Sequence, residues 1–315
     1  MDKDASIYVA GHRGLVGGAI LRRLQQDGHT RLLTRTSAEL DLRDQAAVGA
    51  FFERERPEYV FLAAAKVGGI LANSTRPAEF LYDNLAIASN VIHAAHRSGV
   101  RKLLNLGSSC IYPRLAPQPL REDYLLTGPL EETNRAYAVA KIAAIELCDA
   151  YRAQYGDDFI SAMPTNLYGP GDNFDLQGSH VLPALIRKMV EAKEHGDAQV
   201  VVWGSGTPLR EFLYVDDLAD ACLFLMENFS EPGPLNVGTG EDLSIRDLAT
   251  LIGEVVGFRG DLVFDASKPD GTPRKLMDVS RLRAAGWEAR TGLREGVERT
   301  VAWYLRERGG QLVRR

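Results

Sequence analysis

Short apolar runs alternate with longer segments of helical spacing in the first half of the chain. The apolar runs predict strands at residues 6–10, 30–34, 59–64 and 102–107. Segments with apolar residues three and four positions apart predict helices at 15–28, 78–100 and 136–156. Repeated strand–helix units with right-handed crossovers produce a parallel sheet that carries helices on both faces. We therefore predict an α/β fold built on a doubly wound parallel sheet.

The alternation loosens beyond residue 165. The stretch 164–180, PTNLYGPGDNFDLQGSH, is rich in Gly, Pro, Asn and Asp and predicts a loop. We expect pieces of 211–240 to return to the main sheet and to complete a first domain that covers residues 1–165. Residues 166–210 and 241–315 then form a smaller C-terminal α/β lobe for the substrate.

Three glycines, Gly11, Gly14 and Gly17, follow the first predicted strand directly and open the first helix. Glycine permits a tight turn and a close approach of the backbone to a pyrophosphate, while the helix N-terminus offers N–H groups to the phosphates. The flanking strand and helix make this spacing typical of a Rossmann-type dinucleotide-binding domain. The alternative is a glycine-rich turn that binds nothing.

The second predicted strand ends in Leu33-Thr34-Arg35, without the acid that usually binds the ribose 2′-hydroxyl of NAD. Arg35, together with Arg13 in the glycine loop, is suited to a 2′-phosphate, because a guanidinium pairs with phosphate through two hydrogen bonds. This pattern predicts NADP(H) as the cofactor. The alternative is that Arg35 is an ordinary solvated arginine.

A tyrosine and a lysine, Tyr137 and Lys141 in YAVAK, are four residues apart on one predicted helix. A neighbouring ammonium lowers the pKa of a phenol, and this makes the phenol a better acid or base. Ser108 ends the preceding strand, where ligands bind in α/β sheets, and it can hydrogen-bond the same substrate oxygen. The three residues indicate carbonyl reduction or its reverse, although a Tyr–Lys pair alone is a weak signal.

Longer stretches carry a more specific resemblance. They are AGHRGLVG, LAAAKVGGI, LGSSCIYP, YAVAKIA, MPTNLYGPGDNF, SHVLPALIRK, VVWGSGTPLREFL, VDDLA, NVGTG and FDASKPDGTPRKLMDVSRL. With these the chain resembles the extended short-chain dehydrogenase/reductase superfamily and, within it, the GDP-L-fucose synthases, from near the N-terminus to about residue 287. The resemblance implies a bifunctional, NADPH-dependent enzyme. It would epimerise GDP-4-keto-6-deoxy-D-mannose at C3 and C5 and then reduce C4 to give GDP-L-fucose.

The resemblance also implies roles for the residues of GSSCIYP. Related dehydratases carry an Asp-Glu pair where this chain has Ser109-Cys110. A thiol suits proton abstraction beside a ketone instead, so Cys110 is the expected base and His180, at a predicted helix start, the expected acid. A helix N-terminus lowers the pKa of a histidine. The alternative for each residue is simple packing or capping.

Further site residues follow from the same resemblance. The expected catalytic residues are Ser108, Cys110, Tyr137, Lys141 and His180. The expected NADP(H) contacts are Gly11, His12, Arg13, Gly14, Leu15, Val16, Gly17, Arg35, Leu106, Gly107, Ser108, Ser109, Lys141, Pro164, Thr165, Asn166, Leu167 and His180. The expected nucleotide-sugar contacts are Lys188, Trp203, Arg210 and Asp270. The alternatives are a half-buried strand aromatic for Trp203 and a solvated helix face for Lys188, next to which Arg187 can serve instead.

Composition limits the expected binding partners and the cellular compartment. The 315 residues are 45% hydrophobic and 25% charged, with a net charge of −5 and no basic block, so nucleic acid is not an expected partner. Three widely spaced cysteines without CxxC predict neither disulfides nor a metal site, and they favour a reducing cytoplasm. No stretch approaches the length of a transmembrane helix.

The resemblance implies a homodimer through the helices at 78–98 and 135–155. Two rival functions are an epimerase or reductase for another nucleotide sugar, such as an NAD-dependent 4-epimerase, and a non-catalytic NADP sensor.

Overall fold

The computed structural model describes residues 1–176, 178–268 and 270–313. A six-stranded sheet of β1 (Ile7–Ala10), β2 (Leu32–Leu33), β3 (Tyr59–Leu62), β4 (Lys102–Leu106), β5 (Phe159–Pro164) and β9 (Pro234–Val237) forms its larger part. The strand order is β2-β1-β3-β4-β5-β9, and every neighbouring pair is parallel. Every residue of the five strands other than β2 is buried, as is typical of a sheet covered on both faces. The predicted Rossmann-type sheet is confirmed.

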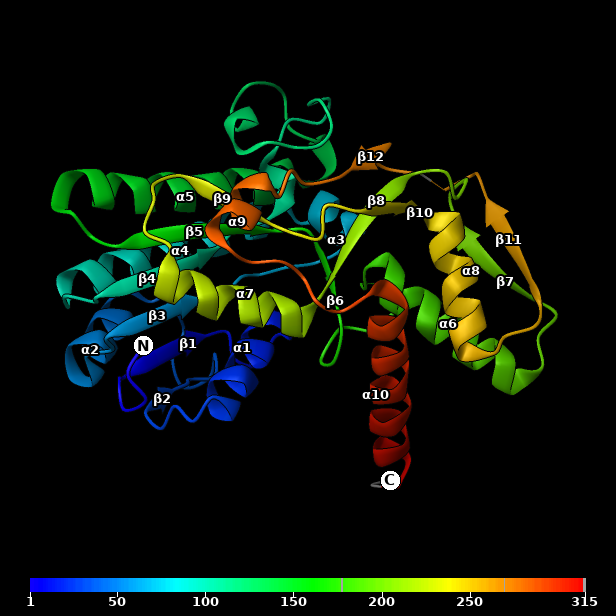
Figure 1. The fold of residues 1–315 in the computed structure, drawn as a ribbon, viewed down its shortest axis with the longest axis horizontal. Coiled ribbons are helices and arrows are strands. Elements are labelled where there is room, and N and C mark those ends of the chain that lie inside the picture. The colour runs from blue at the N-terminus through cyan, green and yellow to red at the C-terminus, as the bar shows by residue number, and fades with distance from the viewer. Residues whose placement is uncertain (177, 269, 314–315) are drawn as a thin grey trace.

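Helices cover both faces of this sheet (Figure 1). On one face α2 (Gln45–Glu55), α4 (Pro77–Arg97) and α5 (Arg135–Tyr155) pack side by side over an apolar cluster that includes Phe52 and Val91. On the other face α1 (Leu15–Gln26) packs against α7 (Val215–Asn228). The pattern of the sequence missed α2, which begins where the Asp44 side chain accepts a hydrogen bond from the Ala47 N–H.

A second, smaller part contains the remaining strands. Strand β8 (Leu209–Tyr214) pairs with β6 (Asn166–Tyr168), β10 (Asp242–Ser244) and β12 (Arg274–Lys275), and β7 (Gln199–Trp203) pairs with β11 (Asp261–Asp265). Helices α6 (Val181–His195), α8 (Ile245–Val256) and α10 (Leu293–Val313) surround them. Of the region near 211–240, α7 and β9 lie in the larger part, whereas residues 211–214 belong to β8 in the second sheet. The division into two domains stays a prediction.

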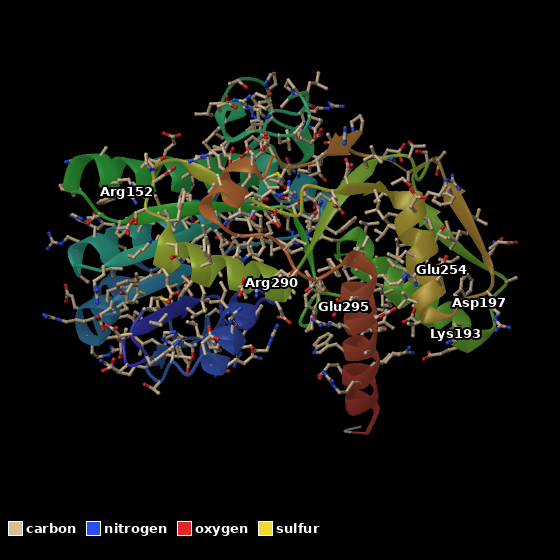
Figure 2. The ribbon with its side chains drawn as sticks, in the orientation of Figure 1. Arg152, Lys193, Asp197, Glu254, Arg290 and Glu295 are labelled. Carbon is tan, nitrogen blue, oxygen red and sulfur yellow. The ribbon has the colours of Figure 1, made fainter. Side chains whose placement is uncertain are left out.

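Several short elements complete the structure. They are α3 (Ile70–Thr75), the 3-10 turns η1 (Ser109–Ile111), η2 (Glu122–Tyr124) and η3 (Glu132–Asn134), and α9 (Ser280–Ala285), which contacts β9. Figure 2 shows charged side chains on the outer helices, among them Glu254 of α8, which forms an ion pair with Arg294 of α10. In the part of the chain that the structure describes, no helix is both long and apolar enough to cross a membrane.

Candidate active site

The glycine loop lies at the carboxyl end of β1. A Cβ on Gly17 would lie 2.2 Å from the Gly11 carbonyl oxygen, and a Cβ on Gly11 would lie 2.8 Å from the Ala64 backbone. Gly11 also adopts φ = +85°, which favours glycine. Gly14 is the N-cap of α1 and brings no capping side chain, so the first N–H groups of this helix stay available to a ligand. These features form the cradle that a dinucleotide pyrophosphate requires.

Two arginines lie beside this cradle. Arg35 donates to the Glu55 carboxylate at 2.8 Å and to the Thr34 carbonyl at 2.7 Å. The pKa of Glu39 is lowered, chiefly by the N–H of Thr36 and further by the charges of Arg35 and Arg13. The charges of both guanidiniums therefore reach the same carboxylate, that of Glu39, which follows β2 along the chain. Glu39 escaped notice in the sequence because it lies beyond the strand end where a ribose-binding acid is expected.

The Ser108, Cys110, Tyr137 and Lys141 side chains converge at the end of β4. Ser108 is the N-cap of η1, and its hydroxyl accepts a hydrogen bond from the Cys110 N–H at 3.5 Å. Helix α5 brings the Lys141 ammonium 5.8 Å from the centre of the Tyr137 ring, and this ammonium donates to the Leu106 carbonyl at 2.8 Å. Burial lowers the pKa of Lys141 to about 8, against the raising effect of Cys110.

The pKa of Tyr137 differs from the expectation. Burial raises it strongly, the charge of Cys110 raises it further, and a hydrogen bond with Ser108 lowers it in part. The lowering by Lys141 that the sequence predicted is not found: desolvation is the largest influence on the pKa of the phenol, and Ser108 is the group that lowers it. Burial likewise raises the pKa of the Cys110 thiol, which is 8% exposed.

Lys275 lies near both expected epimerisation groups. Its charge is the strongest influence that lowers the pKa of Cys110, ahead of Ser108 and Lys141. His180 is the N-cap residue of α6 and keeps an exposed surface, and its pKa is lowered by desolvation of the imidazole and then by the charge of Lys275. The direction agrees with the sequence, but the causes are desolvation and a lysine rather than the helix N-terminus. Lys275 was missed because nothing in the spacing of PRKLM connects it to GSSCIYP.

The other expected cofactor residues cluster at the ends of the central strands. Leu106 ends β4 and Gly107 follows it, and a Cβ on Gly107 would lie 2.2 Å from Met163 side-chain atoms. Ser109 is buried. His12, Leu15 and Val16 belong to the glycine loop and the first turn of α1, while Pro164, Thr165, Asn166 and Leu167 connect β5 to β6.

Asn166 and Thr165 also connect the two parts of the molecule. The Asn166 amide donates to the Glu211 carbonyl at 2.8 Å, and the Thr165 hydroxyl donates to the same oxygen at 3.4 Å. The fully buried Glu211 carboxylate accepts from the N–H groups of Thr239, Gly240 and Met277 at 2.6, 2.8 and 2.8 Å. Glu211 therefore holds the strand that carries Arg210 next to the segment that carries Lys275.

The four expected nucleotide-sugar residues form two neighbouring pairs. The Lys188 ammonium lies 5.2 Å from the centre of the Trp203 ring, and Trp203 is 59% exposed. Arg210 donates to the Asp270 carbonyl at 3.4 Å. The Asp270 carboxylate is already held by the N–H and hydroxyl of Ser205, at 2.7 and 2.8 Å. Over the described residues, no group of His, Cys, Asp and Glu side chains is arranged to hold a metal ion.

A dinucleotide cradle beside a Ser–Tyr–Lys set is the site of a nicotinamide-dependent enzyme that acts on carbonyl groups. Residues 7–238 match the model described as the NAD dependent epimerase/dehydratase family. GDP-L-fucose synthase 1 of Arabidopsis thaliana is 60% identical over 305 residues, which cover 97% of this chain and 94% of that relative. GDP-L-fucose synthase of Escherichia coli (strain K12) is 56% identical over 308 residues, which cover 95% and 96%. The chain therefore belongs to the NAD dependent epimerase/dehydratase family and, within it, to the GDP-L-fucose synthases.

Solved structures agree with this placement. A GDP-L-fucose synthetase from Naegleria fowleri bound to NADP superimposes with a TM-score of 0.90 at 33% identity, covering 98% of this chain and 96% of that one. A GDP-mannoheptose C4 reductase from Campylobacter jejuni with NADP bound gives a TM-score of 0.89 at 39% identity, covering 97% and 99%. The family resemblance read from the sequence motifs is confirmed.

Proposed function

We propose that this chain inverts GDP-4-keto-6-deoxy-D-mannose at C3 and C5 and reduces it at C4 with NADPH, producing GDP-L-fucose. One observation carries the proposal. The thiol, the Ser–Tyr–Lys set and Lys275 lie at one site, in which Cys110 and Lys141 are buried and the other three side chains are half-buried, and Lys275 also acts on His180. One bound ketone can therefore face both the epimerisation groups and the reducing groups.

The glycine cradle and the two arginines fit NADP(H). The uncapped N–H groups of α1 would receive the pyrophosphate, and Arg13 and Arg35 would receive the 2′-phosphate. Bound at this site, NADPH supplies the hydride for reduction of the C4 carbonyl. Lys141 would hold the nicotinamide ribose from its position at the Leu106 carbonyl.

Epimerisation begins with the acidity that the C4 ketone confers on the C3 and C5 protons. Cys110 removes such a proton as a thiolate, and an enolate forms on the sugar. Burial opposes the thiolate, while Lys275, Ser108 and Lys141 favour it. His180 returns a proton from the opposite face, so that the carbon inverts.

Reduction requires a proton for the C4 oxygen. Tyr137 donates it, and its raised pKa keeps the phenol protonated at neutral pH, which is the form that a donor needs. Ser108, which hydrogen-bonds Tyr137, orients the carbonyl between them. The cationic Lys141 stabilises the phenolate that the donation leaves behind.

The second part of the molecule presents groups suited to a GDP-sugar. The exposed Trp203 face offers a stacking surface for the guanine base, and Lys188 and Arg210 offer cations to the pyrophosphate. Because Asp270 already accepts two hydrogen bonds from Ser205, it serves the ligand through its remaining lone pairs.

We further propose a homodimer through α4 and α5. These two helices lie side by side on the outside of the sheet (Figure 1). They carry large exposed side chains, Tyr82 at 68%, Val139 at 39% and Tyr155 at 55%. Analytical ultracentrifugation of Tyr82→Glu should show monomer where the wild type sediments as dimer, and a monomeric wild type would contradict the proposal. Localisation in the cytoplasm stays a prediction.

Deuterium exchange tests the proposed roles of Cys110 and His180. In heavy water without NADPH, the wild type should introduce deuterium at C3 and C5 of the sugar with inversion, as read by NMR. Cys110→Ser should abolish exchange, while His180→Gln should exchange without inverting. Cys148→Ala removes a buried thiol away from the site and serves as the matched control. Exchange at the wild-type rate in Cys110→Ser would show that this thiol only packs.

A further inference from the structure

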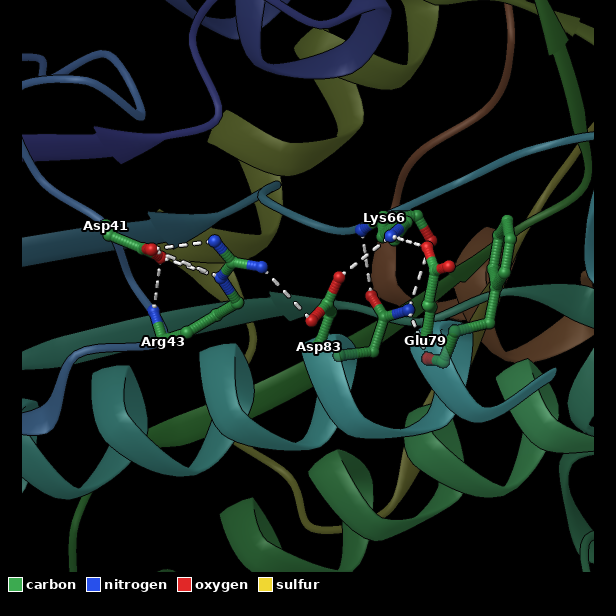
Figure 3. A network of polar contacts seen from close by, with 7 residues as sticks. Asp41, Arg43, Lys66, Glu79 and Asp83 are labelled. Atoms are coloured by element: carbon green, nitrogen blue, oxygen red, sulfur yellow. Dashed lines mark hydrogen bonds and ion pairs between the residues drawn. The ribbon is translucent and has the colours of Figure 1, made fainter. Parts of the chain in front are cut away.

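The segment that follows β3, residues 63–69, is held by polar groups of α4 and of the β2–α2 connection (Figure 3). The Lys66 ammonium donates to the Asp83 carboxylate at 3.0 Å and to Glu79 at 2.5 Å. Asp83 in turn accepts from Arg43 at 3.3 Å, and Arg43 also pairs with Asp41. Asp83 is only 8% exposed and joins both cations.

The backbone of the same segment is fixed as well. The Asn84 amide oxygen accepts from the Lys66 N–H at 3.0 Å, and its amide nitrogen donates to the Lys66 carbonyl at 3.1 Å and to the Phe80 carbonyl at 2.7 Å. The Asn73 amide donates to the carbonyls of Gly68 and Gly69 at 2.7 and 3.1 Å. Both asparagines are buried, so neither exchanges these bonds freely for water.

The held segment touches the elements that carry two catalytic groups. A Cβ on Gly69 would lie 3.6 Å from the carbonyl oxygens of Gly178 and Ser179, so this backbone lies against the residues that precede His180. A Cβ on Gly68 would lie 3.0 Å from the Phe80 ring. That ring packs edge-on against the Tyr137 ring, at 6.4 Å between centres and 82° between planes.

We propose that the clasp formed by Asp83, Lys66 and Asn84 positions residues 66–69 as a support for His180, so that the proton returned during epimerisation arrives from the inverting face. The inference rests on the proposed function of the site. Asp83 and Lys66 touch no reacting atom and act as positioning residues. The Tyr137 side chain is positioned independently of this clasp, because it lies on α5 beside Lys141.

Loss of the clasp should therefore separate proton exchange from inversion. Asp83→Asn keeps the shape of the side chain but removes the charge that Lys66 and Arg43 share. Cys110 still abstracts the proton, and solvent or the thiol returns it to the same face more often. A displacement of about 1 Å in a catalytic group can cost on the order of 100-fold. For a displaced support we expect roughly a fivefold to tenfold fall in the inverted fraction of exchanged sugar.

The ratio of inverted to total deuterated sugar, measured by NMR, is the readout. It is an internal ratio of the folded enzyme, so a loss of stability alone does not move it. Lys66→Met should lower the ratio like Asp83→Asn, and the double variant should add little, because both changes open the same contact. Glu79→Gln removes only the more exposed partner, 51% exposed, and should lower the ratio less.

The matched control is Glu295→Gln, which opens the ion pair with Arg299 on α10 and should leave the ratio unchanged. His180→Gln sets the value for full loss of inversion. If the wild type inverts normally while Asp83→Asn and Lys66→Met both keep the wild-type ratio, the clasp does not position His180. If the wild type neither exchanges nor inverts, the proposed function itself fails, and the positioning role falls with it.

Discussion

Replacement of Arg35 by alanine should weaken the binding of NADPH and leave the binding of NADH almost unchanged. Loss of one charge-assisted phosphate contact costs about 1.5–3 kcal/mol, which corresponds to roughly a 10- to 150-fold rise in Kd. Arg35 already donates to Glu55 at 2.8 Å, and its side chain is 30% exposed. Because that carboxylate and water compete with the phosphate, we expect the lower end, a rise of about tenfold.

Two carboxylates near Arg13 and Arg35 provide a second test of the same assignment. Glu55→Gln releases Arg35 from its ion pair, and Glu39→Gln removes the carboxylate on which Arg35 and Arg13 both act. Each variant should bind NADPH more tightly than the wild type and NADH about equally.

Arg54→Ala provides the matched control. Arg54 also pairs with Glu55 and lies over the Phe51 ring, but it is 63% exposed and was not predicted at the cofactor. Isothermal titration with both cofactors at one salt concentration measures the series. An equal loss of NADPH and NADH affinity in Arg35→Ala, or no loss of either, would refute the assignment of this guanidinium to the 2′-phosphate.

Three further predictions concern chemistry and stability. Tyr137→Phe should lower NADPH oxidation by about two orders of magnitude or more while deuterium still enters at C3 and C5, and unchanged oxidation would exclude Tyr137 as the proton donor. Lys141 has a pKa of about 8 and loses its charge above it, so kcat/KM for reduction should fall as the pH rises through this value, whereas a flat profile well beyond it would contradict the role. Glu211→Ala leaves three backbone N–H groups without their hydrogen-bond acceptor and should lower the free energy of unfolding by ~3 kcal/mol or more. Glu211→Gln keeps one acceptor oxygen and should lower the free energy of unfolding by about 1–3 kcal/mol. Urea unfolding measures both, and wild-type stability in the alanine variant would show that these bonds contribute nothing.

The sequence predicted the larger sheet well because its strands are continuous apolar runs and its helices have a clear amphipathic spacing. Helix α2 was not predicted because the apolar and polar residues of QAAVGAFFERE do not alternate with a clear helical period, and its start depends on the Asp44 cap. Residues 211–214 were expected to join the main sheet, but β8 lies in the second sheet. A buried apolar run fits either sheet equally, so its partner is decided by tertiary packing.

The residues of the candidate site were predicted by motif, but of their pKa shifts only the direction for His180 was predicted. Tyr137 was expected to have a lowered pKa because Lys141 is near, yet desolvation raises it, and burial also raises the pKa of Cys110. Desolvation depends on how the whole chain closes around a group, which local spacing does not encode. Lys275 lies far along the chain from GSSCIYP, and Asp83 lies on the helix that follows the motif of Lys66, so the fold is needed to show that either residue acts on the site.

Identification of the product tests the central claim most directly. The purified protein is mixed with GDP-4-keto-6-deoxy-D-mannose and NADPH, and the sugar is examined by NMR. The account predicts GDP-L-fucose, inverted at both C3 and C5 and reduced at C4, with one NADPH oxidised for each sugar formed. A product reduced at C4 but still in the manno configuration, or a sugar recovered unchanged with no NADPH consumed, would contradict it.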